Sequence, residues 1–315
     1  MNVKINTAIV PITYKCNLHC NFCFASAKGN IDSFMSIDYF KSKVDELKKL
    51  GLKQIVLTGG EPLMHPKIGE IVSIANSCNL DIQLLTNGTS PKILNIAHSI
   101  NNITISIDGR SKNHDHVRGR KGSLEKAVNT LQLLNDKTSC SITMTVSEKN
   151  FSDIEYVYLL GMELEVSSIT INPVVAEGRA KDQILYTNFY DKVFLELKRI
   201  YKKYGFRIPM FTSLSTLENF QKNLPKLIFN LYSSVWFDQN NNYSLFPLPM
   251  HQDSPLIFRN LASLSSSQTF THFLIEENHN YNPEEVIDTH SYLKKQFLRF
   301  LVEEDEIVQN SFFRK

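Results

Sequence analysis

Cysteine is scarce in this chain, with five residues among 315. An odd number of cysteines without spread-out pairing argues against the disulfide framework of a secreted protein. An excess of one charge sign is also missing, since the net charge is +2 with both signs interspersed, so the basic stripe of a nucleic-acid binder is excluded. The sequence has no run of roughly 18 apolar residues and no signal-peptide pattern, which predicts neither a membrane span nor export. We therefore expect a cytoplasmic protein.

Three of the five cysteines nonetheless lie within eight residues of one another. Cys16, Cys20 and Cys23 fall in the segment YKCNLHCNFCFAS, directly after the first expected strand. Three thiolates without a nearby pair of histidines fit zinc poorly, because zinc sites take four protein ligands or three plus water. A [4Fe–4S] cluster has four irons, so three thiolates leave one iron open to a ligand from outside the protein. The alternative is three buried or reactive thiols that fall together by coincidence.

Short β-branched segments alternate with helical patterns through the first 175 residues. The expected strands are 7–13, 54–60, 82–88, 103–109, 142–146 and 168–175. The expected helices are Ser36–Leu50, Lys67–Asn76, Pro91–His98, Ser123–Asn135 and Ser152–Leu160. The apolar residues of the strands are nearly continuous, which favours parallel strands buried on both faces. Six such units predict an α/β fold, either a closed or partly closed barrel or a doubly wound open sheet.

The pattern changes after residue 180. A long amphipathic helix is expected over Asp182–Tyr204, a hairpin around the polar turn Gln239–Asn242, and a final helix over Pro283–Glu304. We therefore predict two parts, with the strand–helix units in residues 1–180 and a small α+β cap in residues 181–315.

The segment CNLHCNFC resembles the CxxxCxΦC signature of the radical S-adenosylmethionine (SAM) superfamily, with Phe22 as the aromatic residue. The resemblance implies one [4Fe–4S] cluster on the three cysteines, whose open iron is chelated by the amino and carboxylate groups of SAM. It covers about residues 7–180. It also implies a partial (β/α)6 TIM-like barrel, whose active site lies at the C-terminal ends of the strands.

Two motifs that follow the second and third strands extend the resemblance. GGEP at residues 59–62 is similar to the family motif whose backbone groups hold the SAM amino group. TNG at residues 86–88 is similar to a family segment with polar contacts near SAM. The SAM contacts that these motifs imply are Gly59, Gly60, Glu61, Pro62, Thr86 and Asn87.

The fourth and sixth strands lead into segments similar to the family branch that carries SPASM or twitch extensions. In SIDG…HDHVRGRKGS, Ser106 and Asp108 are expected to reach the SAM ribose or carboxylate. Arg118 is expected to pair with the SAM carboxylate, because a planar guanidinium suits two-point contact with a carboxylate. In INPVVAEGRA, Asn172 and Val174 are expected to line the adenine pocket.

Several residues of these segments keep two interpretations. His114 and Asp115 are either site residues or a pair in a surface loop. Arg179 either fixes the loop that contains it or contacts substrate. Cys78 and Cys140 are expected to behave as small buried apolar residues.

The C-terminal hairpin resembles a SPASM or twitch region, but no cysteine follows Cys140. An auxiliary cluster held by this part is therefore not expected. We predict a degenerate, twitch-like cap, and an unrelated small cap is the alternative.

The resemblance implies an enzyme that reductively cleaves SAM to a 5′-deoxyadenosyl radical, which abstracts hydrogen from a substrate. The first hypothesis is modification of a ribosomally synthesised peptide. The second is action on a small metabolite, such as a sugar, nucleoside or tetrapyrrole precursor, and a third is a non-catalytic SAM-binding scaffold. The implied partners are SAM, the substrate and a flavodoxin- or ferredoxin-type reductant. The sequence assigns no catalytic acid, base or hydrogen donor.

Overall fold

The computed structural model describes residues 5–174, 178–181, 189–205, 207–212, 234–237, 243–245 and 257–258. All six expected strands are present: β1 (Thr7–Thr13), β2 (Gln54–Gly59), β3 (Asp81–Thr86), β4 (Asn102–Ser106), β5 (Ser139–Val146) and β6 (Ser168–Pro173). Each pairs in parallel with the next. In the described residues β1 and β6 do not meet, because a further strand pairs with each of them. The sheet is therefore open, as the partial barrel predicts.

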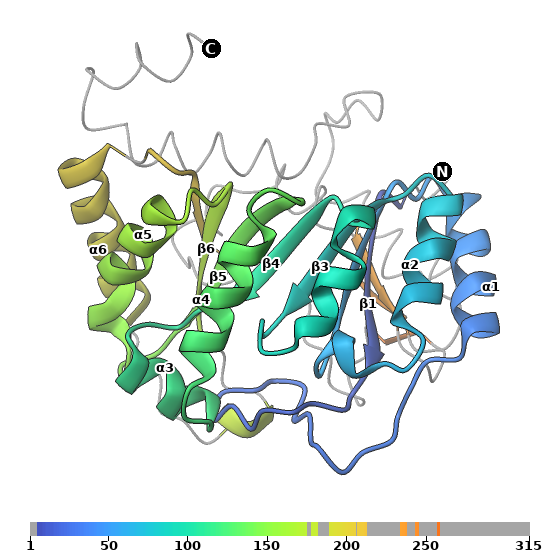
Figure 1. Ribbon diagram of the computed structural model, residues 1–315, viewed down its shortest axis with the longest axis horizontal. Coiled ribbons are helices and arrows are strands. Elements are labelled where there is room, and N and C mark those ends of the chain that lie inside the picture. The colour runs from blue at the N-terminus through green and yellow to red at the C-terminus, as the bar shows by residue number, and fades with distance from the viewer. Residues whose placement is uncertain are drawn as a thin grey trace, which may run out of the picture.

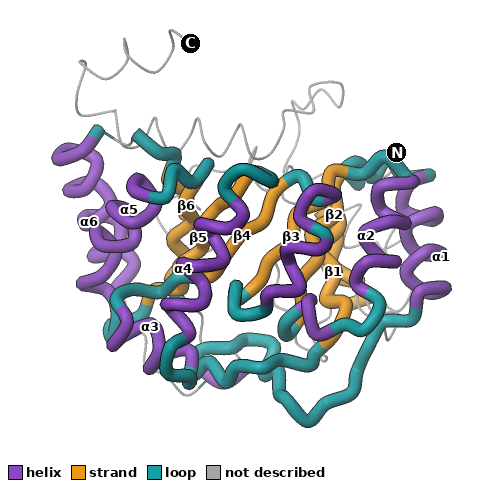
Figure 2. The backbone as a smooth tube through the Cα atoms, viewed as in Figure 1, coloured by secondary structure: helices purple, strands orange, loops and turns teal. Residues whose placement is uncertain are grey.

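Helices cover one face of this sheet (Figures 1 and 2). They are α1 (Ile37–Lys48), α2 (Ile68–Ser77), α3 (Ser111–Arg118), α4 (Ser123–Leu134), α5 (Ile154–Glu163) and α6 (Phe189–Tyr204). Ser36 caps the start of α1, since its hydroxyl accepts a hydrogen bond from the Tyr39 N–H at 3.2 Å. One apolar core joins the buried sides of the helices to the strands. None of the helices in the described residues combines the length and apolar composition that a bilayer crossing needs.

The prediction that the strands are buried on both faces holds for the centres of β2 and β4. It is wrong for β3, β6 and the second half of β5, where buried and partly exposed residues alternate. Along β5, Cys140, Ile142 and Met144 are buried in the core, whereas Thr143 and Thr145 between them are partly exposed. The helices cover only the outer face of an open barrel, so the inner face keeps polar side chains. Hydroxyl and amide groups bridge neighbouring strands on that face, as in the 2.9 Å contact between the hydroxyls of Ser141 and Ser168.

Short strands extend the sheet at both edges. At one edge, β8 (Ser234–Phe237) pairs in parallel with β1, and Thr7 lies opposite Ser234. The strand β9 (Tyr243–Leu245) pairs antiparallel with β8, which confirms the predicted hairpin, and β10 (Ile257–Phe258) pairs with β9. At the other edge β7 (Met210–Thr212) lies beside β6.

Three helix predictions differ from the structure or fall outside it. Pro91–His98 forms two short 3₁₀ helices, Pro91–Asn95 and Ala97–Ser99, because Ile96 between them leaves helical geometry at φ −123°. The helix expected over Asp182–Tyr204 is described only from Phe189. The turn Gln239–Asn242 and the helix Pro283–Glu304 lie outside the described residues.

Candidate active site

The motifs that the sequence singles out all follow the C-terminal ends of strands. The cysteine loop, residues 14–28, follows β1, and GGEP and TNG lie where β2 and β3 end. In Figure 1 this loop runs along the edge of the molecule where α3 also lies. The site is therefore built from segments that parallel strands bring to one edge, as the predicted barrel requires.

The three loop cysteines share one apolar cluster. Cys16 and Cys20 are each 8% exposed, Cys23 is partly buried, and all three are free thiols. The other members are Leu18, Phe22, Ala27, Val117, Val174 and Ala180, which places the predicted Phe22 and Val174 beside the cysteines. Burial raises the pKa of Cys16 to about 12 and also raises the pKa of Cys20. The Cys16 and Cys20 thiols therefore stay protonated in the metal-free protein, and metal binding would release their protons.

This all-thiol donor set fits an iron–sulfur cluster, whose irons take cysteine ligands. In the part of the chain that the structure describes, no three His, Cys, Asp or Glu side chains gather closely enough to hold a single metal ion.

Backbone contacts hold the cysteine loop from two sides. The N–H groups of His19 and Asn21 donate to the last carbonyls of α3, at 3.3 and 3.0 Å. On the other side, the Arg179 guanidinium donates to the Cys20 carbonyl at 2.6 Å and to the Ala27 carbonyl at 2.7 Å. These contacts support the interpretation of Arg179 as a residue that fixes a loop.

The two glycines of GGEP let the end of β2 approach the cysteine loop. The Gly60 N–H donates to the Thr13 carbonyl at 2.7 Å. A Cβ atom would lie 2.1 Å from the Thr13 oxygen at Gly59, and 2.3 Å from the Lys15 oxygen at Gly60. Both positions therefore require glycine, whether or not a ligand is bound. Pro62 is buried and begins a short 3₁₀ helix, Pro62–Met64.

Glu61 is a buried link between the ends of β2 and β3. Its carboxylate is fully buried and accepts from the Thr86 hydroxyl at 2.7 Å, the Asn87 N–H at 2.8 Å and the Leu63 N–H at 3.1 Å. Burial raises the pKa of Glu61, although the three hydrogen bonds oppose that shift. The Asn87 amide continues the network to Asn17 in the cysteine loop at 2.8 Å, a contact that the sequence analysis missed.

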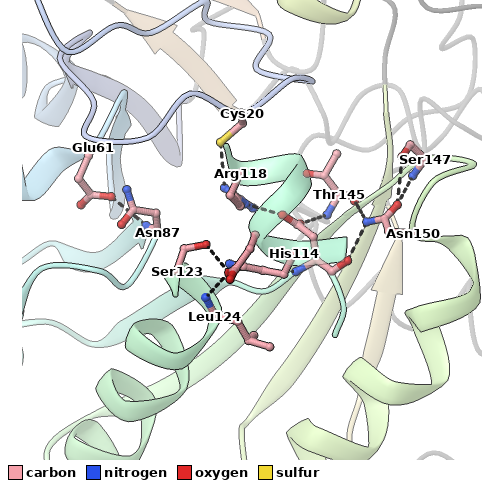
Figure 3. A network of polar contacts seen from close by, with 12 residues as sticks. Cys20, Glu61, Asn87, His114, Arg118, Ser123, Leu124, Thr145, Ser147 and Asn150 are labelled. Carbon is pink, nitrogen blue, oxygen red and sulfur yellow. Dashed lines mark hydrogen bonds and ion pairs between the residues drawn. The ribbon is translucent and has the colours of Figure 1, made fainter. Parts of the chain in front are cut away.

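Arg118 and Asp108 form a buried ion pair. Figure 3 shows Arg118 next to Cys20. The Arg118 Nε donates to one Asp108 oxygen, while the other oxygen accepts from the Thr145 N–H at 2.8 Å. The Arg118 Nη1 lies 3.8 Å from the Cys20 Sγ, and the guanidinium lies over the Phe22 ring at 5.2 Å. Burial lowers the pKa of Arg118, but the Asp108 carboxylate and the Cys20 sulfur raise it above its usual value overall. Asp108 is 0% exposed and both of its oxygens are engaged, so its observed role is to hold Arg118, and its contact with the SAM ribose or carboxylate stays a prediction.

His114 lies inside the fold, and the surface-loop interpretation of His114 and Asp115 is wrong because both belong to α3. His114 is 1% exposed, and its Nδ1 accepts from the Asp108 N–H at 3.0 Å, which leaves the proton on Nε2. Its Nε2 has no hydrogen-bond partner in the described structure. Asp115 caps the start of α4 by accepting from the N–H groups of Gly122 at 2.6 Å and Leu124 at 3.0 Å.

His114 gives a testable pH dependence of stability. Burial lowers its pKa to about 4 from a usual value of 6.5, so between these values the unfolded chain binds a proton that the folded protein does not. The free energy of unfolding should therefore fall by about 3 kcal/mol as the pH falls from 6.5 to 4. Urea unfolding across this range measures the effect. In His114→Asn, the side-chain oxygen can still accept the Asp108 N–H, and most of this dependence of the unfolding free energy on pH should disappear. An unchanged dependence would contradict its assignment to His114.

The remaining predicted residues lie on the inner face. Ser106 ends β4 opposite Thr143, and the Asn172 amide donates to the Thr143 hydroxyl at 3.3 Å. Asn150, to which no sequence motif points, is fully buried and donates to the carbonyls of Asp108 and Thr145, both at 2.8 Å. An asparagine in a loop carries no sequence signal for this role.

Comparisons with known proteins show which proteins this chain is similar to. Residues 10–160 match the family model of the Radical SAM superfamily. The sporulation killing factor maturation protein SkfB of Bacillus subtilis (strain 168) is 28% identical over 206 residues, 63% of this chain and 50% of SkfB. The AdoMet-dependent heme synthase of Methanosarcina barkeri (strain Fusaro / DSM 804) is 29% identical over 178 residues, 54% of this chain and 51% of the synthase.

A solved structure shares the fold. Streptococcus suis SuiB bound to precursor peptide SuiA matches with a TM-score of 0.67 at 12% identity, over 84% of this chain and 62% of that one. The chain spans about half the length of the curated relatives named above. The matched residues 10–160 contain the cysteine loop, GGEP and the Asp108–Arg118 pair, so this part of the chain matches the radical SAM superfamily.

Proposed function

We propose that this protein is a radical SAM enzyme that holds one [4Fe–4S] cluster through Cys16, Cys20 and Cys23. The observation that carries the proposal is the gathering of these three free thiols in one apolar cluster at the C-terminal edge of an open parallel sheet. When bound, the cluster would supply the electron that cleaves SAM to methionine and a 5′-deoxyadenosyl radical, which would abstract hydrogen from substrate. Anaerobic reconstitution with iron and sulfide, followed by assay of SAM cleavage, tests this function.

The chain's own residues would bind SAM, orient it and exclude water. Arg118 is held by Asp108 before any ligand arrives, so its planar guanidinium is ready for a carboxylate. Glu61 fixes the segment that contains Thr86 and Asn87. We propose these residues as direct SAM contacts: Phe22, Gly59, Gly60, Pro62, Thr86, Asn87, Ser106, Arg118, Asn172 and Val174. In this proposal Glu61 and Asp108 are positioning residues.

Replacing Arg118 with lysine should weaken SAM binding roughly tenfold while the iron content stays the same. Lysine keeps the positive charge that balances Asp108, but it loses the two-point contact with a carboxylate. A SAM titration followed through the EPR spectrum of the reduced cluster measures the affinity, with iron analysis as the control. Equal affinities of the two proteins would remove Arg118 from the SAM site.

For the substrate we propose a ribosomally synthesised peptide. SkfB is named as a maturation protein, and SuiB was solved with a precursor peptide. The second candidate is a small metabolite of the tetrapyrrole class, which the heme synthase relative favours. A non-catalytic scaffold is the third, and the intact cysteine loop and GGEP argue against it.

Mass spectrometry of reactions in D₂O separates these substrates. A crosslinked peptide loses two hydrogens, and an epimerised residue that takes hydrogen from an exchangeable donor gains one deuterium. A mass change in a tetrapyrrole, and none in candidate peptides, would favour the second substrate class.

We propose that residues 1–180 form the catalytic barrel and residues 181–315 a cap without an auxiliary cluster. No cysteine follows Cys140, so thiolate ligands are missing from that part. The cap would then act on substrate by shape and polar contacts. We further propose a cytoplasmic location and a reductant of the flavodoxin or ferredoxin type.

A further inference from the structure

The outer side of the cysteine loop exposes an aromatic ring next to a proposed cluster ligand. Phe24 directly follows Cys23 and is 49% exposed. Among the large apolar side chains that are exposed in the described residues, it is the only aromatic one. The Cys23 carbonyl beside it accepts the Ser26 N–H at 3.1 Å and the Arg179 N–H at 3.0 Å, so the turn that presents the ring is fixed.

Four positive side chains lie in the cysteine loop or in segments next to it. Lys28, Arg120, Lys121 and Lys181 are all exposed. The Lys28 carbonyl accepts the Cys16 N–H at 3.1 Å, and the Arg120 Nη1 donates to the Asn17 carbonyl at 3.5 Å. Both residues are therefore tied to the cysteine loop itself. We call Phe24, Lys28, Arg120, Lys121 and Lys181 the loop face.

Lys181 and Lys121 reach the same loop through their neighbours. Lys181 lies two residues after Arg179, which holds the loop through the Cys20 carbonyl at 2.6 Å. Lys121 follows Arg120 in the turn between α3 and α4. Segments far apart in sequence thus bring four positive residues to the cysteine loop or next to residues that contact it.

Three acids close to the loop face are already engaged. Asp32 pairs with Lys15, and Asp108 is buried against Arg118. The Asp115 carboxylate accepts from the start of α4, including the Ser123 hydroxyl at 2.9 Å. The four charges of the loop face are therefore not neutralised by these acids.

We propose that the loop face is the docking surface for an acidic one-electron carrier protein of the ferredoxin class. This inference rests on the proposed function, since the carrier supplies the electron that the cluster needs. Phe24 directly follows Cys23, so a carrier seated on the ring approaches the cluster through this proposed ligand. An apolar centre with a charged rim is the usual anatomy of an interface, and complementary charge speeds the encounter. One electron passes from the reduced carrier to the cluster, and no atom or proton is transferred.

Charge reversal on this surface tests the proposal on the reconstituted full chain. The test variant combines Lys28→Glu, Arg120→Glu and Lys181→Glu. The matched control combines Lys49→Glu, Lys53→Glu and Lys137→Glu, three exposed lysines that precede strands and so lie toward the opposite edge of the sheet. Both variants change the net charge equally. Reduction by a ferredoxin of strongly negative charge is measured as stopped-flow bleaching of the cluster absorbance. Photoreduced deazaflavin, a small uncharged reductant, is the control that does not depend on docking.

We expect the loop-face variant to be reduced by ferredoxin at least tenfold more slowly than wild type at low salt, and the control less than threefold more slowly. The difference should shrink at high salt, where charges are screened. Reduction by deazaflavin should be the same for all three proteins. Phe24→Ala should slow the ferredoxin reaction at both salt concentrations.

Equal ferredoxin rates for the two triple variants would overturn the docking surface and leave the proposed function standing. Wild-type protein that binds no iron, or whose cluster deazaflavin cannot reduce, would overturn the proposed function and this inference with it.

Discussion

Replacing Cys16, Cys20 and Cys23 together with alanine should reduce the iron bound after anaerobic reconstitution from about four atoms per chain to nearly none. SAM cleavage should be lost with it. The thiols lie in one apolar cluster, and no other cysteines of the chain lie near them in sequence. Iron analysis and visible absorption of the reconstituted protein measure the effect.

The matched control is the double variant Cys78→Ala and Cys140→Ala. Cys140 is buried on β5 and Cys78 packs at the edge of the core, so both have structural positions away from the loop. This variant should keep about four irons, with a modest loss of stability. Circular dichroism checks that the triple variant folds, which is expected because Arg179 and α3 hold the loop through its backbone. A folded triple variant that still binds about four irons would show that the ligand assignment is wrong.

Replacing Asp108 with alanine should lower the free energy of unfolding by about 3–5 kcal/mol. The substitution leaves the buried Arg118 cation without its partner and the Thr145 N–H without its acceptor. Both groups are then desolvated without compensation. Urea denaturation of the metal-free protein measures this effect independently of the cluster.

Asp115→Ala provides the comparison, because Asp115 is a partly exposed carboxylate of α3 that caps the start of α4. Its loss should cost only about 1 kcal/mol, the usual effect of a removed cap. Adding Arg118→Met to Asp108→Ala should recover part of the lost stability, since it removes the uncompensated charge. Equal losses for Asp108→Ala and Asp115→Ala would contradict the buried ion pair.

The local pattern of the chain predicts the repeated part of the fold. All six expected strands are found, because β-branched runs and intervening amphipathic segments are signals within a short window. The pairing of β8 with β1 joins residues 7–9 to residues 234–236, and no local pattern encodes such a contact. The local pattern also did not predict the polar inner face. Whether alternate residues of a strand pack against helices depends on how far the sheet closes, which is a property of the whole fold.

Sequence motifs located the site but did not separate its roles. Cys16, Cys20 and Cys23 gather as predicted, because close spacing in one loop limits how far apart they lie. The motif residues Glu61 and Asp108 are instead fully buried and hold other site residues in place. Their roles follow from burial and partners that are distant in sequence, as does the role of Asn150, so the tertiary structure is needed to assign them.

The central claim is one cluster, held by three cysteines, with one iron open to SAM. Iron analysis and Mössbauer spectroscopy of the anaerobically reconstituted wild-type chain test it most directly. We predict about four irons per chain in a single [4Fe–4S] cluster, with one iron whose signal changes when SAM is added. Eight or twelve irons, no iron, or four irons that are all unaffected by SAM would contradict the account.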